Sequence, residues 1–159
     1  MKPKIDIFVQ SRKSFPPRLK KKIKYAAQKT LHLIPQAKLK NKIKTEKKCT
    51  ISVAIIGPKE SQTFNFQYRG KNRPTDVLAF SRMESSLDHF KFENRDLGDV
   101  LICWSVAKRQ AMLYETSIEE ELSRLTIHGI LHLFGYDHEL NLNEEKKMFR
   151  LQNKILKSL

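Results

Sequence analysis

Three histidines near the C-terminus have the spacing of a metal-binding cluster. They lie in the stretch HGILHLFGYDH, in which His132 stands between His128 and His138. On an α-helix, a spacing of four residues places the side chains of His128 and His132 on one face, one turn apart. Gly135 suits the end of that helix and predicts a turn that returns His138 on a loop. Three imidazoles that converge in this way are typical of catalytic zinc sites, which keep a fourth position for water.

The same spacing occurs in the metzincin peptidases, but one functional residue of those enzymes is absent here. Metzincins carry a glutamate directly after the first histidine as the general base, and this chain has Gly129 at that position. Glycine cannot move a proton, so the sequence keeps the metal ligands without the proteolytic base. A structural zinc site would usually have four ligands, often cysteines, yet Cys49 and Cys103 are both distant in sequence. Chance clustering, or histidines satisfied in a core, is the alternative to a metal site.

The positive charge of the chain is concentrated in its N-terminal third. The formal net charge is +14, and residues 1–48 hold 16 Lys and Arg against 2 Asp and Glu. A localised positive field attracts polyanions, so nucleic acid and an anionic membrane are both possible partners. A merely solvated lysine-rich face is the alternative. Residues 36–48 have no aromatic side chains between their cations, which predicts contacts to phosphate rather than base stacking. The candidates there are Lys38, Lys40, Lys42 and Lys44.

A second group of cations precedes a predicted strand. Arg69, Lys71 and Arg73 lie around Gly70 and Pro74, which indicate a turn. Three cations on one turn could contact phosphate groups. Cations on turns are more often simply solvated, so the spacing alone leaves both interpretations open.

The elements that would position these residues follow from hydrophobic spacing. Strands are predicted over residues 4–10, 49–56, 77–80 and 98–104, with the second one central in the sheet. Helices are predicted over residues 18–34, 59–69, 105–114 and 143–157. A further helix begins at Ser117, with Glu120 completing a capping box, and carries the first two histidines of the cluster. Residues 82–97 are expected to form a charged excursion in which His89 lies on the surface.

Length and composition indicate one domain, residues 1–159, in a reducing compartment. The chain of 159 residues suits a single core. Its two cysteines are far apart, which argues against a disulfide framework. The N-terminal residues lack the apolar stretch of a signal peptide, and no apolar run approaches the roughly 20 residues that span a bilayer. We therefore expect a soluble protein of the cytoplasm.

Three stretches of the sequence resemble a known family. They are YRGKNRPTDVLAF, LGDVLIC and HGILHLFGYDH, in that order along the chain. Together they resemble the YbeY-type bacterial endoribonucleases, the ribosomal RNA maturation factors, over roughly residues 49–157. Two positions depart from the usual family pattern. Asn72 stands where aspartate is usual and Ala79 where serine is common, and neither position belongs to the histidine motif.

The resemblance implies an α/β (α+β) fold, with a small mixed four-stranded sheet and about five helices. It implies one Zn²⁺ per chain, bound by His128, His132 and His138, and a functional arginine at Arg69. The implied activity is metal-dependent cleavage of single-stranded RNA, in maturation of the 3′ end of small-subunit (16S) ribosomal RNA and in ribosome quality control. Precursor ribosomal RNA and the small ribosomal subunit are the implied partners.

The chemistry that these residues could perform agrees with a nuclease and leaves two other classes of protein open. Zinc can lower the pKa of its water to about 7 or polarise a phosphoryl oxygen. Arg69 could stabilise the charge that develops on the phosphate during cleavage. Asp137 and Glu139 flank the third histidine and could orient it, move protons or simply solvate the turn. A metallopeptidase would explain the histidine spacing, and a non-catalytic ribosome-assembly factor with structural zinc would explain the charge.

Overall fold

A computed structural model describes residues 4–35, 37–38, 43, 48–82 and 94–159. Four strands and five helices lie within these ranges, in agreement with the predicted fold class. None of these helices is long and apolar enough to cross a membrane. The elements in chain order are β1 (Lys4–Gln10), α1 (Pro17–Leu33), β2 (Lys48–Ile56), α3 (Pro58–Arg69), β3 (Val77–Ser81), β4 (Asn94–Cys103), α4 (Trp104–Leu113), α5 (Ile118–Leu133) and α6 (Leu142–Leu156).

The four strands form one mixed sheet in the order β1-β2-β4-β3. The first three strands in that order are parallel, and β3 runs antiparallel to β4 at the edge. The predicted central position of β2 is therefore confirmed. Ile51 and Val53 of this strand are completely buried, which explains why its sequence is rich in β-branched residues.

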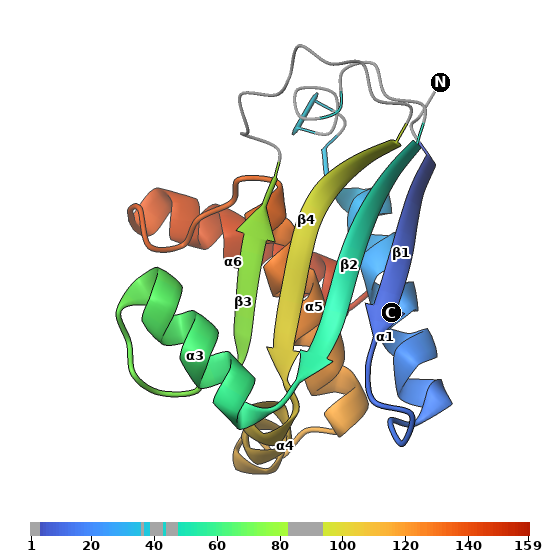
Figure 1. Ribbon diagram of the computed structural model, residues 1–159. Coiled ribbons are helices and arrows are strands. Elements are labelled where there is room, and N and C mark those ends of the chain that lie inside the picture. The colour runs from blue at the N-terminus through green and yellow to red at the C-terminus, as the bar shows by residue number, and fades with distance from the viewer. Residues whose placement is uncertain (1–3, 36, 39–42, 44–47, 83–93) are drawn as a thin grey trace.

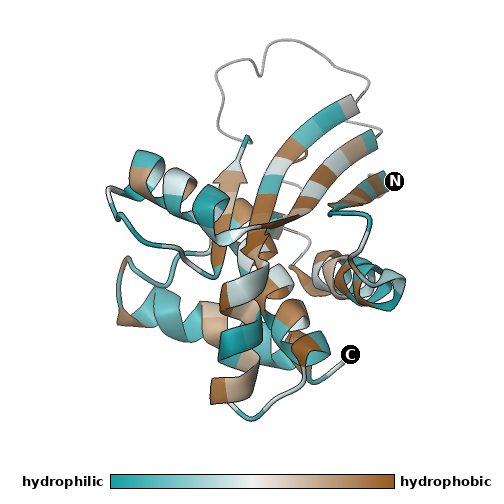
Figure 2. Ribbon diagram, turned by 60° about the horizontal axis from the view of Figure 1, so that its bottom comes forward, coloured by the Kyte–Doolittle hydropathy of each residue, from teal (hydrophilic) through white to brown (hydrophobic). Residues whose placement is uncertain are grey.

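Helices α1, α5 and α6 lie behind the sheet in the view of Figure 1, and α3 lies beside the β3 edge. Helix α5 is the most buried of them, with 10 of its 16 residues buried. Apolar residues gather where the helices face the sheet, and hydrophilic residues predominate on the outer sides of the helices (Figure 2). Burial of this apolar surface is what holds α5, and with it the first two histidines, against the strands.

Strand β4 begins earlier than the sequence predicted. We expected a strand from Gly98 to Trp104, but β4 starts at Asn94, and Trp104 is the first residue of α4. The pairing with β2 shifts register here, because Thr50 pairs with Asp96 and Ile51 with Gly98. The extra residue forms a bulge, and backbone pairing overrides the polar composition of residues 94–96. Gly98 adopts a φ of 135°, which favours glycine, and a Cβ there would lie 2.2 Å from the carbonyl oxygen of Phe80 on β3.

Candidate active site

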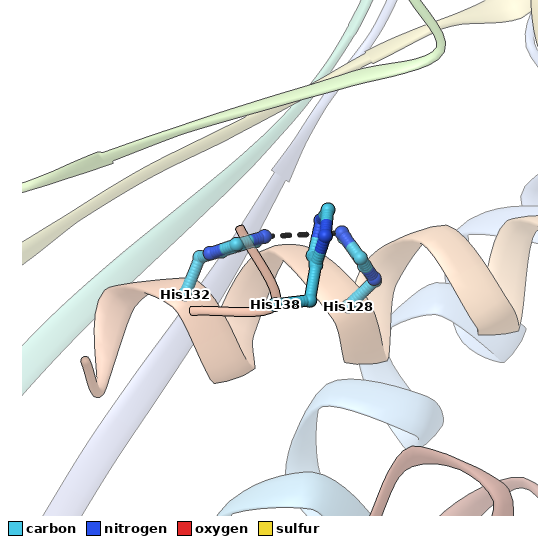
Figure 3. A group of neighbouring side chains, drawn as sticks. All are labelled: His128, His132 and His138. Carbon is cyan, nitrogen blue, oxygen red and sulfur yellow. Dashed lines mark hydrogen bonds between the residues drawn. The ribbon is translucent and has the colours of Figure 1, made fainter. Parts of the chain in front are cut away.

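The three histidines of the sequence cluster lie together at the C-terminal end of α5. Their ring centroids are 4.7 to 5.2 Å apart, and the rings point toward one another in Figure 3. Nε2 of His128 and Nε2 of His132 are 3.1 Å apart. One ligand atom from each of the three side chains lies within 4.8 Å of the others. In the part of the chain that the structure describes, this is the one group of three potential ligands that could hold a metal ion.

The helix ends in a way that brings the third histidine back to the first two. Helix α5 is capped at Phe134, and Gly135 follows with a left-handed φ of 78°. The Gly135 amide donates to the His132 carbonyl at 2.9 Å, and the Tyr136 amide donates to that of Leu131 at 3.1 Å. These bonds satisfy carbonyls at the helix end while the chain reverses. His138 therefore reaches the helix pair from the following loop, which is the arrangement that the glycine predicted.

Hydrogen bonding and burial prepare two of the imidazoles to donate lone pairs. Nδ1 of His128 lies 2.9 Å from Oε1 of Gln152, a buried residue of α6. An amide oxygen only accepts, so Nδ1 carries the proton and Nε2, which faces Nε2 of His132, is unprotonated. Burial, together with His132, lowers the pKa of His128 to about 4. Burial also lowers the pKa of His132, with a smaller effect of His138. Both rings are therefore neutral near pH 7.

A cleft of about 260 Å³ opens onto the three histidines. Two arginines line it as well, Arg69 at the end of α3 and Arg124 on α5. Larger cavities exist, such as one of about 580 Å³ between Lys22, Tyr114 and Leu159. The candidate site is the smaller cleft, because all three histidines line it.

Among the three predicted turn cations, Arg69 is the one that lines the cleft. It is the last residue of α3, which ends where the helix predicted over residues 59–69 ends, and the turn follows at Gly70 with φ of 68°. Lys71 and Arg73 are exposed on the loop that follows. Asn65 holds this loop, since its Nδ2 donates to the Arg73 carbonyl at 2.7 Å. The loop backbone is thereby fixed next to the cleft, with cations along its outer side.

Arg124 lines the cleft and was not predicted from the sequence. Its guanidinium donates to both carboxylate oxygens of Glu121, at 2.9 and 2.6 Å, and lies 3.8 Å from Asp76. Glu121 is buried, so this bidentate pair fixes the arginine at the wall of the cleft. The signal was available, because residues 124, 128 and 132 recur at four-residue spacing on one helix face. Gln152 was also missed, and no local spacing links it to His128.

The structure gives a steric reason for glycine after the first histidine. A Cβ on Gly129 would lie 2.4 Å from Cγ1 of Val100 on β4. Helix α5 therefore packs directly on the sheet at this position, and no glutamate side chain fits there. Glu139 also lines the cleft, whereas the Asp137 carboxylate accepts the Glu139 amide at 2.8 Å and so stabilises the turn.

Of the four candidate lysines in the basic segment, Lys38 is described by the structure. Lys40, Lys42 and Lys44 lie outside the described residues. The Lys38 ammonium lies 4.5 Å from the centroid of the Tyr136 ring and 3.4 Å from the Gly135 carbonyl oxygen. One end of the basic segment thus contacts the loop that carries the third histidine.

The fold and the site define a mixed α/β protein whose cleft joins three potential metal ligands to two arginines. A family model described as endoribonuclease YbeY matches residues 16–159. The chain belongs to the endoribonuclease YbeY family, which supports a nuclease that hydrolyses RNA. The resemblance noted from the sequence motifs is thereby confirmed.

Relatives from distant bacteria agree with this placement. The chain is 44% identical over 110 residues to the endoribonuclease YbeY of Oceanobacillus iheyensis, covering 67% of this chain and 71% of that protein. It is 45% identical over 109 residues to that of Aquifex aeolicus, covering 69% of each. A solution structure of a Thermotoga maritima protein matches with a TM-score of 0.57 and 28% identity, over 95% of this chain and 87% of that one.

Proposed function

We propose that residues 1–159 form one zinc-dependent endoribonuclease domain specific for single-stranded RNA. Its role would be maturation of the 3′ end of small-subunit (16S) ribosomal RNA and ribosome quality control, with precursor ribosomal RNA and the small subunit as partners. The observation that carries the proposal is the cleft in which three convergent imidazoles face an arginine. Family membership supports the RNA substrate. The cytoplasmic location expected from the sequence stays a prediction.

The donor set fits a zinc ion. His128, His132 and His138 supply three nitrogen ligands, and at least two of these rings are neutral near pH 7. Gln152 would orient the His128 ring and fix its tautomer. A bound zinc ion would supply Lewis acidity, which polarises a phosphoryl oxygen and lowers the pKa of an attacking water.

The side chains of the chain would bind and orient the RNA. Arg69 is the proposed catalytic residue, because its planar guanidinium can grip the scissile phosphate through two parallel hydrogen bonds. The guanidinium would then stabilise the negative charge that develops on the phosphate oxygens during cleavage. Lys71 and Arg73 would hold neighbouring phosphates, and the basic segment would hold more distant ones. The proposed phosphate ligands of that segment are Lys38, Lys40, Lys42 and Lys44.

Two other functions can be separated from this one by assay. The absence of room for a glutamate at Gly129 argues against a peptidase of the metzincin type. A structural zinc site in a non-catalytic assembly factor would need no open cleft. Purified protein should be incubated with single-stranded RNA and with casein, each with and without a chelator. Chelator-sensitive cleavage of RNA alone supports the nuclease, casein cleavage supports the peptidase, and cleavage of neither supports the assembly factor.

A further inference from the structure

A group of aromatic side chains lies beside the cleft, where α3 meets β3. The ring centroids of Tyr68 and Phe80 are 4.8 Å apart, and Phe64 lies 6.3 Å from each. We call these three residues the aromatic group. Tyr68 directly precedes Arg69, and Phe80 directly follows Ala79, and both of these neighbours line the cleft. The aromatic group therefore adjoins the cleft along two separate segments of the chain.

The exposure of Tyr68 is unusual for a ring in an aromatic cluster. Its side chain is 59% exposed although it packs against Phe80. Burial of an aromatic ring is favourable, so a ring held in place and left largely in solvent can offer its surface to a ligand. Tyr68 stands in the last turn of α3, and β3 is an edge strand. Both features place the ring at the rim of the molecule, where an extended ligand can reach it.

Three exposed cations follow this exposed ring closely along the chain. Arg69, Lys71 and Arg73 follow Tyr68 within five residues. The loop is held by Gly70 in its left-handed conformation and by the bond between Asn65 and the Arg73 carbonyl. An exposed aromatic ring beside cations is the combination that binds single-stranded RNA, because bases stack on the ring while phosphates contact the cations.

We propose that the aromatic group, with Tyr68 as its exposed ring, is a stacking platform for an unpaired base next to the scissile phosphate. The inference rests on the proposed function and names how the substrate is recognised. Ala79 faces the cleft and Phe80 the opposite side of β3, since side chains alternate along a strand. The RNA would cross this edge strand. Arg69 would contact the phosphate that lies between the base on the platform and the cleft. A base inside a duplex is stacked on both faces, so the platform selects single strands without selecting sequence.

Binding of a fluorescein-labelled single-stranded decauridylate to zinc-loaded protein tests the platform. Tyr68→Ala should weaken binding on the order of 5- to 150-fold, the loss typical for one stacked base. Tyr68→Phe keeps the ring and should bind like wild type. Phe66→Ala is the matched control, because Phe66 is equally exposed at 59% on the same helix but points away from Tyr68 at a spacing of two residues. It should leave the affinity unchanged.

Two further readouts separate stacking from charge and from folding. The slope of log affinity against log salt should be the same for Tyr68→Ala as for wild type, because no phosphate contact is lost. An abasic ribose-phosphate decamer should bind both proteins alike. Equal decauridylate binding by Tyr68→Ala and wild type, or equal losses in Tyr68→Ala and Phe66→Ala, would overturn the platform alone. Failure of the wild type to bind any single-stranded RNA would instead overturn the proposed function, and the platform with it.

Discussion

Among single residues, substitution of Arg69 would distinguish the proposed RNA-cleaving site from a metal-stabilised scaffold. It lines the cleft but is exposed, so it contributes little to folding. Arg69→Lys keeps the charge and loses the planar fork, and Arg69→Glu reverses the charge. We expect both variants to cleave single-stranded RNA about 100- to 1,000-fold more slowly, as for loss of an electrostatic stabiliser. Zinc content and thermal melting should be unchanged.

Arg109→Glu provides the control for this change, because Arg109 is an exposed arginine on α4 outside the cleft. It should cleave at the wild-type rate. Near-normal cleavage by Arg69→Glu would refute a role of Arg69 in cleavage. A lowered melting temperature would show that Arg69 has a structural role instead.

Gln152 acts on the cluster through His128 and has no predicted contact with substrate. Replacement by leucine removes the acceptor of the Nδ1 proton, which leaves the orientation and tautomer of His128 unfixed. Zinc affinity, measured by competition with a chromophoric chelator, should fall about 10- to 100-fold in Gln152→Leu. Asn153→Ala, the exposed neighbour on α6, should keep the affinity of the wild type. Unchanged affinity in Gln152→Leu would show that the hydrogen bond does not support metal binding.

At the scale of elements, the contact between α5 and β4 sets how close the histidine helix lies to the sheet. Gly129→Ala would place a Cβ 2.4 Å from Val100. The resulting strain should lower the free energy of unfolding by about 1–3 kcal/mol. This loss should appear although alanine normally stabilises a helix interior by roughly 1 kcal/mol relative to glycine. Urea unfolding measures the change. In a double-mutant cycle, Val100→Ala should recover part of the loss, and strictly additive costs would contradict the clash.

The sequence predicted these elements well wherever the signal was local. The capping box of Ser117 and Glu120 is present at the start of α5, and the turn at Gly135 follows from its left-handed preference. Features that depend on tertiary contacts were not predictable in this way. The early start of β4 at Asn94 depends on pairing with β2, and the contact of Gln152 with His128 joins positions 24 residues apart.

At the scale of the whole molecule, basic side chains from distant segments share one groove. A cavity of about 530 Å³ is lined by Lys38 and by Lys147, Arg150 and Lys154 of α6. Lys38 also contacts the loop that precedes His138. Lys38 therefore lies beside the loop that carries the third histidine although it is remote in sequence, and it shares a groove with three further cations that could bind a polyanion.

Salt dependence of RNA binding tests whether this charge is used. Binding of single-stranded RNA should weaken steeply with salt, mostly through residues 18–48. Each lost phosphate contact reduces the slope of log affinity against log salt by about 0.7. We expect a clearly smaller slope when Lys38, Lys40, Lys42 and Lys44 are all changed to glutamine. A matched variant should keep the slope, with the exposed lysines Lys59, Lys108, Lys146 and Lys157 changed instead. Equal salt-dependence slopes in both variants would show that the basic segment is only a solvated surface.

In the proposed function, the three-histidine cluster makes this chain a metal-dependent nuclease. The most direct test is titration of metal-depleted protein with zinc while cleavage of single-stranded RNA is followed. We predict no cleavage without metal, and activity that saturates at about one zinc per chain for a three-ligand site. His128→Ala and His132→Ala should bind little zinc and stay inactive. Full cleavage by the metal-depleted wild type would contradict metal-dependent cleavage, and full zinc occupancy in both histidine variants would contradict metal binding by the cluster.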